Sequence, residues 1–471
     1  MNDLPMWFQH AAELIATFVV AVGLLHTLFY VLELIFAGCA LYNRHSPLSA
    51  KALWERYADN APPIALLAPA YNEALTIIES VEALLSLQYP DFEVIVVNDG
   101  SKDETLETLI RHYDLRAVER YYDPAIPSEP IRGLFATPNQ PRLLVVDKSN
   151  GGKSDAINAG INVARAPLMC VIDADTLLRS DALLRVARPF IDNPSETVAV
   201  GGTIRIANGS KVEAGRVVEV LLPRKFLALV QIIEYSRAFM TRLGLCEMRT
   251  LMIISGAFGA FRRSAVIEVG GFSRGTVGED FEVVVKLHRH FREQRRPYQI
   301  KYIPDAVAWT EAPENLKMLR NRRSRWQRGA LETFHKHYDM FLNPRYGRVG
   351  FLGFGQVWVV DFMGPLVELL GLLLVPPLWV IEAISTGYAL AFVMVTILSG
   401  VLISMITLLL EEVQARHVPK VHDFLTLALV AVLEGFGYRQ LNNFWRMRGW
   451  WQFMCKKDGW GDMARKGFQK A

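Results

Sequence analysis

The sequence predicts an α/β domain with a mainly parallel sheet, inserted between membrane-spanning helices. Two observations support this prediction. Long apolar runs are concentrated at the two ends of the 471-residue chain. Between residues 60 and 340, short β-branched runs alternate with amphipathic segments, which indicates strands joined by helices that cover a parallel sheet. The length also exceeds the roughly 100–200 residues of one domain, so more than one domain is expected.

The amino-terminal apolar run predicts a membrane helix. Residues 11–42 are interrupted only by Glu13, His26 and Glu33, and the run exceeds the roughly 20 residues that cross a bilayer. Residues 1–10 contain no Lys or Arg, unlike the start of a secretory signal. A buried helix of a soluble protein is the alternative, which the length of the run disfavours. Basic residues after the run place the next segment in the cytoplasm and the amino terminus outside.

Two further spans are predicted near the carboxyl end, at residues 362–381 and 388–410. Residues 351–360 are Gly-rich and are expected to lie along the interface, as is the shorter run 424–438. The predicted division of the chain is an amino-terminal helix (1–45), a cytoplasmic domain (60–340), interfacial and transmembrane helices (345–440) and a basic, Trp-rich cytoplasmic tail (441–471).

Charge and cysteine content exclude several classes of protein. The net charge is +3, with 51 Lys and Arg against 48 Asp and Glu, so the chain as a whole is not a binder of polyanions, and no nucleic-acid partner is expected. The four cysteines are far apart and form no CxxC pair. This spacing argues against a zinc site and against a disulfide framework, and it fits a reducing compartment.

Polar residues follow the predicted strands of the middle region. Strands are expected at residues 64–70, 92–97, 143–146 and 168–172, helices at 74–87 and 104–113, and a surface loop at 114–142. Polar runs follow three of these strands, at 69–73, 98–103 and 173–176. Because ligands of parallel sheets bind at the carboxyl ends of the strands, the chemistry is expected there.

Asp173 and Asp175 form a carboxylate pair directly after a predicted strand. Two such hard oxygen ligands can hold Mg²⁺ or Mn²⁺, which in turn neutralises a diphosphate. Acidic turns are common, however, and most of them are solvated and bind no ligand. The same alternative applies to Asp99, because Asn-Asp-Gly-Ser is also an ordinary turn sequence. The succession of three polar strand ends favours a ligand site.

The run 147–158 contains Gly-Gly-Lys-Ser but is not a phosphate-binding P-loop. That pattern requires a glycine where this chain has Asp147. A flexible turn with Lys153 at a helix amino terminus remains, which suits a charged ligand. A glycine-rich turn that caps a helix is an equal alternative.

Glu279 and Asp280 begin an apparent helix at residues 281–290. An acidic pair at a helix start is favoured by the helix dipole alone. A carboxylate there can also act as a general base that takes a proton from a hydroxyl. Spacing in the sequence does not decide between the two.

The ordered motifs resemble those of the family-2 inverting glycosyltransferases, specifically the membrane-integrated synthases of cellulose, chitin, hyaluronan and poly-N-acetylglucosamine. Each motif is unspecific, but their order and spacing over about residues 60–330 are specific. The matching runs are PAYNE (69–73), NDGSKD (98–103), GGKSDAIN (151–158), DADT (173–176), SGAFGAFR (255–262), GED (278–280) and RSRW (323–326).

The resemblance implies a Rossmann-like GT-A fold that binds a UDP-sugar. It places three residues at the uridine, Tyr71, Glu73 and Asp99. It places Lys153 near the nucleotide, and Asp173 and Asp175 at the diphosphate and its Mg²⁺ or Mn²⁺. It implies that Asp280, with Glu279 beside it, deprotonates the acceptor hydroxyl for a direct attack that inverts the anomeric carbon.

The family pattern QxxRW is met by Arg325 and Trp326, whereas Arg322 replaces the glutamine. The resemblance implies that the Trp stacks on the acceptor sugar and that the Arg lies near the diphosphate. The glutamine accompanies processive synthesis, so its replacement bears on processivity. Three neighbouring arginines are expected to contact lipid headgroups instead: Arg320, Arg323 and Arg328.

The sequence therefore predicts an enzyme of the inner (plasma) membrane that extends a β-linked polysaccharide and exports it through its own helices. A polysaccharide or lipid-linked acceptor, the bilayer and envelope export proteins are the expected partners. Two alternatives stay open. One is a transferase that adds a single sugar to a polyprenyl-phosphate or other lipid-linked acceptor, and the other is a non-catalytic scaffold, against which the intact motif residues argue.

Overall fold

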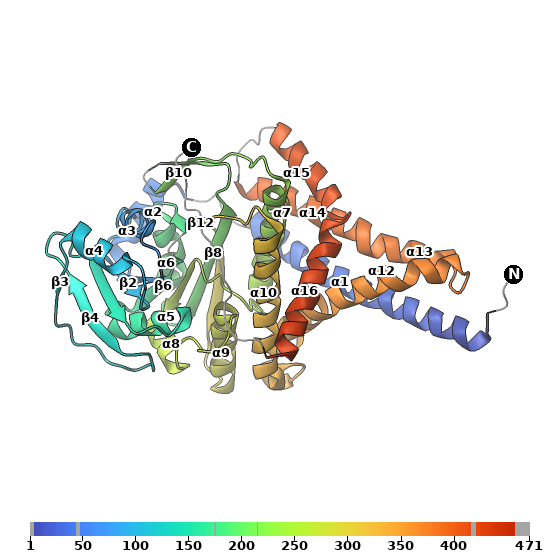
Figure 1. Cartoon of the computed structure of the whole chain (residues 1–471), viewed down its shortest axis with the longest axis horizontal. Helices are drawn as coiled ribbons and strands as arrows, with labels where there is room; N and C mark the ends of the chain where they lie inside the picture. The colour runs from blue at the N-terminus through green and yellow to red at the C-terminus, as the bar shows by residue number, and fades with distance from the viewer. Residues whose placement is uncertain (1–3, 44–47, 174–175, 214, 416–420, 457–471) are drawn as a thin grey trace. The chain divides into compact units, whose positions relative to one another are not determined.

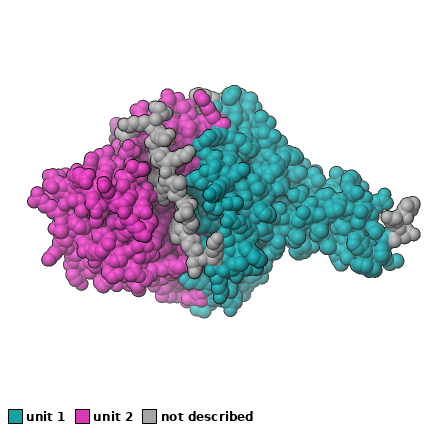
Figure 2. All heavy atoms as spheres, viewed as in Figure 1, with its two compact units in different colours: residues 1–43, 225–250, 313–461 teal, residues 44–224, 251–312, 462–471 magenta. Residues whose placement is uncertain are grey.

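The computed structural model describes residues 4–43, 48–173, 176–213, 215–415 and 421–456. The chain forms two compact units, coloured separately in Figure 2. Unit 1 holds the described residues of 1–43, 225–250 and 313–461, and unit 2 those of 44–224 and 251–312. The division differs from the predicted domain 60–340, because helices at 225–250 and after 313 pack against membrane helices instead of the sheet.

Unit 2 is built on a sheet with the strand order β3-β4-β5-β2-β1-β6-β11-β8-β12-β7. The strands are β1 (Ile64–Ala70), β2 (Phe92–Asn98), β3 (Arg116–Ala117), β4 (Ile131–Ala136), β5 (Leu143–Lys148), β6 (Leu168–Val171), β7 (Leu177–Leu178), β8 (Thr197–Ile206), β11 (Gly259–Arg262) and β12 (Gln299–Thr310). A separate hairpin pairs β9 (Lys211–Glu213) with β10 (Arg216–Glu219). The predicted mixed α/β class is confirmed.

Strand β1 occupies the centre of the site-forming half of this sheet. It pairs in parallel with β2 on one side and with β6 on the other, and β2 pairs in parallel with β5. Residues 64–67 of β1 are fully buried, which explains its continuous apolar sequence, because a parallel strand is covered on both faces. The chain order reverses between β1 and β6, so the crevice at their carboxyl ends is the expected ligand site.

Figure 1 shows helices along this sheet. They are α2 (Ala50–Tyr57), α3 (Ile77–Leu85), α4 (Thr105–Tyr113), α5 (Lys153–Val163), α6 (Ala182–Asp192), α8 (Arg263–Glu268) and α9 (Glu279–Glu293). Right-handed crossovers put α3 and α4 on one face and α5 on the other. Helix α9 begins two residues before its predicted start, so Glu279 and Asp280 lie in its first turn.

The predicted loop 114–142 is more regular than expected. It contains β3 and β4, and β4 pairs antiparallel with β5. The side chain of Asn162 in α5 fixes the rest, because it donates to the carbonyl of Ile126 at 2.7 Å and accepts from its amide at 3.0 Å. The sequence did not predict these pairings, because its prolines are typical of turns and the partners lie in distant segments of the chain.

Unit 1 is helical within its described residues. Its helices are α1 (Met6–Asn43), α7 (Phe226–Glu247), α10 (Leu316–Lys336), α11 (Phe354–Gln356), α12 (Gly364–Val380), α13 (Thr386–Val393), α14 (Ser399–Ala415), α15 (Val421–Glu434) and α16 (Tyr438–Met454). Wider π-helical turns join several of them, at η4 (Val349–Gly353), η5 (Val357–Met363) and η6 (Met394–Leu398). Figure 1 shows α1 running beside α12 and α13, and these helices are in contact.

Three helical segments are long and apolar enough to cross a membrane: residues 6–43, 349–380 and 386–414. The pair α15 and α16, bent by 58°, makes a fourth if it counts as one span. Residues 351–360, predicted to lie along the interface, are continuous with the helix that follows them. By length and composition, the chain is a membrane protein.

Candidate active site

The turns after β1 and β2 are tied together by hydrogen bonds. Asn72 adopts a left-handed backbone (φ 56°), its amide donates to Ser101 Oγ at 3.0 Å, and its Oδ1 accepts from the Lys102 amide at 2.9 Å. The Glu73 amide donates to Thr105 Oγ1 at 2.9 Å. This pairing holds the side chain of Tyr71, 43% exposed, at the rim of the strand ends.

Asp99 lies below that rim and is almost fully buried, with 3% of its surface exposed. Its carboxylate accepts a bond from Lys148 Nζ at 2.6 Å, and Lys148 also pairs with Asp155 at 2.7 Å. Burial raises the pKa of Asp99, although the bonds from Lys148 and from the Gly151 amide act in the opposite direction. Asp99 is therefore part of a buried ionic cluster.

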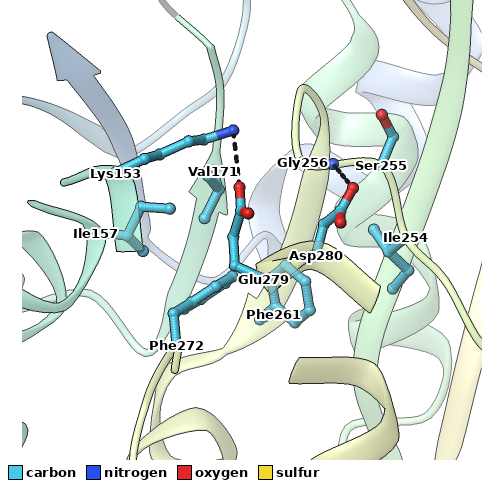
Figure 3. Close-up of a pocket in the computed structure, with 10 residues that line it drawn as sticks. All are labelled: Lys153, Ile157, Val171, Ile254, Ser255, Gly256, Phe261, Phe272, Glu279 and Asp280. Carbon is cyan, nitrogen blue, oxygen red and sulfur yellow. Dashed lines mark hydrogen bonds and ion pairs between the residues drawn. The ribbon is translucent and has the colours of Figure 1, made fainter. Parts of the chain in front are cut away.

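Lys153 begins helix α5 and lies between two carboxylates. Its Nζ is 2.6 Å from Asp173 Oδ1 and 3.3 Å from Glu279 Oε1, and Figure 3 shows it reaching toward Glu279. Burial lowers the pKa of Lys153, but the charges of Asp173 and Glu279 outweigh this and raise it overall. Burial raises the pKa of Glu279 to about 7, and the charge of Asp280 adds to the rise while Lys153 opposes it.

The carboxylate of Asp280 faces Gly256, beside Glu279, as Figure 3 shows. Its Oδ2 accepts the Gly256 amide at 3.2 Å and its Oδ1 accepts the Phe281 amide at 2.9 Å. Gly256 lies close to both charged groups, because a Cβ there would lie 3.3 Å from Lys153 Nζ and 3.5 Å from Asp280 Oδ2. One small pocket is lined by Lys153, Gly256, Glu279 and Asp280, and its other lining residues are mainly apolar.

The residues at Asp173 fit a divalent cation. The carboxylate of Asp173 already attracts a cationic group, the ammonium of Lys153. The same turn carries Thr176, whose buried hydroxyl has no hydrogen-bond partner in the described part of the chain. Hard oxygens of this kind suit Mg²⁺ and Mn²⁺. Asp175, the second predicted ligand, lies outside the described residues, and those described include no cluster of three or more metal-binding side chains.

The acceptor residues predicted at the end of the motif series lie in α10 of unit 1, not in the unit that carries the carboxylates. There the guanidinium groups of Arg322 and Arg323 both lie 4.8 Å from the ring centroid of Trp326. Arg322 also donates to the Tyr235 hydroxyl at 2.7 Å. Trp326 is 41% exposed. Arg325 is half-buried on the same helix.

Two neighbouring arginines do not have the predicted lipid contact. Arg323 pairs with Glu234 of α7, and Arg328, only 4% exposed, pairs with Glu332 at 3.4 Å. The prediction that they contact headgroups is wrong, because both are enclosed by the helices of unit 1. Buried charges of this kind need partners within the protein.

Sequence reasoning missed Lys148 and Gly256 as members of the site. Lys148 lies two residues beyond the predicted strand 143–146, and only the fold shows that it is fully buried between two carboxylates. Gly256 lies among the small residues Ser-Gly-Ala at positions 255–257. That run was a signal of a close backbone approach.

The sequence is similar to a known protein family and to several known enzymes. Residues 66–270 match the family Glycosyl transferase family 2. The chain is 29% identical over 301 residues to poly-beta-1,6-N-acetyl-D-glucosamine synthase of Staphylococcus epidermidis, covering 63% of this chain and 61% of that protein. It is 30% identical over 305 residues to the synthase of the same name from Staphylococcus aureus (strain COL), covering 64% and 62%. The chain thus spans about three fifths of the length of these relatives.

The fold also occurs in a solved glycosyltransferase. Mannosyltransferase PcManGT from Pyrobaculum calidifontis, in complex with GDP-Man and Mn²⁺, aligns with a TM-score of 0.54 and 15% identity, over 96% of this chain and 100% of that one. At this identity the likeness concerns the fold alone. Together with the family match, it confirms the resemblance expected from the motifs: residues 66–270 match Glycosyl transferase family 2, and the chain is similar in sequence to the two synthases over about three fifths of its length.

Proposed function

We propose that the chain is an inverting membrane glycosyltransferase that moves a sugar from a UDP-sugar to a growing β-linked polysaccharide. One observation carries the proposal. Lys153 at the start of α5 pairs with Asp173, which follows β6, and with Glu279, while the neighbouring carboxylate of Asp280 faces the Gly256 amide. The reaction needs two such neighbouring places, since the leaving diphosphate and the attacking hydroxyl lie on opposite sides of the sugar.

The donor is held by residues at the strand ends. Tyr71 and Glu73 lie at the rim for the uridine, and Lys153 lies where it can pair with a diphosphate oxygen. Asp173 and Asp175 would hold Mg²⁺ or Mn²⁺, and such a cation would stabilise the negative charge that develops on the departing diphosphate. The mannosyltransferase of the same fold contains a nucleotide sugar and Mn²⁺, which supports this class of donor.

Asp280 acts as the general base. Each of its oxygens accepts one backbone amide, and a carboxylate oxygen has room for a second bond, here from the acceptor hydroxyl. The hydroxyl proton passes to Asp280 as the hydroxyl oxygen bonds to the anomeric carbon. The bond from that carbon to the diphosphate breaks, and UDP leaves with the electron pair. Inversion turns an α-linked donor into a β-linked product.

The membrane helices of unit 1 serve the acceptor and the product. The basic residues that follow α1 place the catalytic unit on the cytoplasmic side of the inner membrane. Trp326 offers an exposed ring on which an acceptor sugar can stack. The product then leaves through the helices of unit 1, toward envelope proteins that continue its export.

The donor and the product are tested together. Purified full-length protein in lipid nanodiscs is incubated with Mg²⁺ or Mn²⁺ and a panel of radiolabelled UDP-sugars. UDP release and product length are then measured. UDP-N-acetylglucosamine is the first donor to test, because the two related synthases are named for an N-acetyl-D-glucosamine polymer. A β-linked polymer supports the proposal, and the absence of UDP release with every donor contradicts it.

Arg322 favours a second candidate, a single-sugar transferase that uses a lipid-linked acceptor. Its guanidinium lies over Trp326 and donates to Tyr235, whereas processive relatives carry glutamine at this position. A cation there suits an acceptor that carries phosphate. If this candidate holds, the wild-type protein adds one sugar and Arg322→Gln lengthens the product. If the wild-type product is already a polymer, the candidate is wrong.

A further inference from the structure

Helix α5 and the segment 271–278, which leads into α9, are joined by a pair of buried hydrogen bonds. Asn158 of α5 donates from Nδ2 to the Phe272 carbonyl at 2.8 Å, and its Oδ1 accepts the Phe272 amide at 2.8 Å. Both residues are buried. A side-chain amide that satisfies both backbone groups of one residue fixes that residue in place. Asn158 therefore holds the beginning of the segment 271–278 against α5.

Gly271 permits this close approach. Its backbone has φ +71°, and a Cβ there would meet Asn158 Oδ1 at 2.5 Å. A side chain at this position would push the segment away from α5, and the left-handed backbone itself favours glycine. The carbonyl of Gly271 in turn accepts a hydrogen bond from Lys286 Nζ of α9 at 2.6 Å. The segment is thus tied to both helices at its start.

Asp155 makes a second connection between α5 and the same segment. Its carboxylate is fully buried in the first turn of α5 and lies 2.9 Å from Arg274 Nη1 and 2.7 Å from Lys148 Nζ. It also accepts the Glu129 amide, and the Glu129 carboxylate pairs with Arg274 at 3.0 Å. A buried carboxylate needs such cationic partners. Because Lys148 also neutralises Asp155, the fold does not depend on Arg274 alone.

The two helices joined in this way both begin in the candidate site. Helix α5 begins with Lys153, and α9 begins with Glu279 and Asp280. One pocket, drawn in Figure 3, is lined by these three residues and by Phe272. The segment that contains Phe272 leads directly into α9. A shift of this segment relative to α5 would therefore change the distance between the ammonium group and the two carboxylates.

We propose that Asn158 and Arg274 are positioning residues that set the separation between Lys153, on the donor side, and the general base Asp280, on the acceptor side. This inference rests on the proposed function, because it assigns a purpose to contacts around the same site. Both residues act through the segment 271–278. Their loss is therefore expected to displace the base while the groups that bind the donor stay in place.

Arg274→Ala is the first variant to test. Arg274 is 43% exposed, and Asp155 keeps its bond to Lys148 without it, so the variant is expected to fold. A small displacement of the base costs much rate but removes no donor contact, so we expect kcat about tenfold lower, with UDP affinity within about twofold of wild type. A kcat within about twofold of wild type, or a loss of UDP affinity as large as the loss of kcat, overturns the inference.

Two further variants separate positioning from general stability. Arg274→Lys is expected to recover most of the lost kcat, because Arg274 reaches Asp155 through a single nitrogen that an ammonium group can replace. Arg296→Ala is the matched control, since Arg296 is 46% exposed and pairs with Glu268 at 2.6 Å beyond the end of α9. We expect wild-type kcat in this control. If Arg296→Ala lowers kcat as much as Arg274→Ala does, the inference fails.

Hydrogen exchange tests the same contacts without any nucleotide. The Phe272 amide donates to Asn158, so peptides that cover residues 271–278 are expected to exchange slowly in the wild-type protein and faster in Arg274→Ala. In Arg296→Ala they are expected to match the wild type. Unchanged exchange in Arg274→Ala overturns the inference. If the wild-type protein binds no UDP and turns over no donor, the proposed function fails, and exchange alone then decides whether Arg274 holds the segment.

Discussion

At the scale of single residues, the site separates two neighbouring carboxylates by their surroundings. Glu279 is buried and faces Lys153, whereas Asp280 is half-buried and faces the Gly256 amide. Adjacent residues of a helix point in different directions, about 100° apart, so one carboxylate can serve the donor side and the other the acceptor side. The helix start, which the helix dipole alone would also favour, therefore offers two carboxylates in different surroundings.

The raised pKa of Glu279 makes stability depend on pH. Its pKa rises from 4.5 to about 7 on folding. Between these values the folded protein binds more protons than the unfolded chain, so this contribution to stability is complete below pH 4.5 and is lost as the pH rises through about 7. Glu279→Gln lacks the titration. We expect its melting temperature, relative to wild type, to increase from pH 4.5 to pH 7, as measured by thermal unfolding at a series of pH values.

The control for this titration is the region above pH 7.5, where the difference in melting temperature between the two proteins is expected to stay constant. A difference that is flat over the whole range means that Glu279 is ionised in the folded protein at every pH tested. That result would remove the assignment of a raised pKa.

At the scale of elements, the loop before β11 brings a backbone amide to Asp280. Gly256→Ala puts a methyl group 3.3 Å from Lys153 Nζ and from Asp280 Cβ, tighter than ordinary van der Waals contact. A small displacement of reacting groups costs much rate, so we expect kcat to fall about tenfold or more with little change in melting temperature. Steady-state kinetics with the identified donor measure this effect.

Gly387→Ala is the control for that substitution. A Cβ there meets only Ser385 Oγ, at 3.5 Å, and the position lies at the start of α13. Wild-type kcat in both variants would show that the approach of the Gly256 loop does not matter for the reaction.

The strands could be predicted because a buried strand needs a continuous run of apolar residues, and such a run is visible in the sequence itself. β1 has the predicted bounds, and the other three strands agree within two residues. Asn162 and Lys148 could not be placed from the sequence, because their partners lie in other segments of the chain and an isolated polar residue does not reveal its distant contacts. For the same reason the sequence indicated that Asp99 and Lys153 belong to a site but not which groups they bind.

At the scale of the whole molecule, the chain divides into two units, and the candidate site residues are distributed over both. The carboxylates and Lys153 belong to unit 2, while the aromatic and arginine residues of α10 belong to the helical unit. The sequence placed both sets in one domain, since nothing in a run of residues shows which core a helix joins. The three candidate spans all belong to unit 1.

The orientation of the carboxyl end can be measured with Cys455, which is exposed at the end of α16. Two other cysteines, Cys170 and Cys246, are buried, and Cys39 is removed by a Cys39→Ser substitution. A cytoplasmic tail predicts that a membrane-impermeant maleimide labels Cys455 only after the cells are permeabilised. Labelling in intact cells would instead place this end of the chain outside and require an odd number of crossings after α10.

The role of Asp280 as the general base is the central claim, and one comparison tests it directly. Turnover of the donor and affinity for UDP are measured for wild type and for Asp280→Asn, which keeps the shape of the side chain and removes its basicity. Loss of a general base predicts a kcat at least about 100-fold lower, with UDP affinity unchanged within about threefold. An Asp280→Asn protein that turns over its donor at the wild-type rate would contradict the claim.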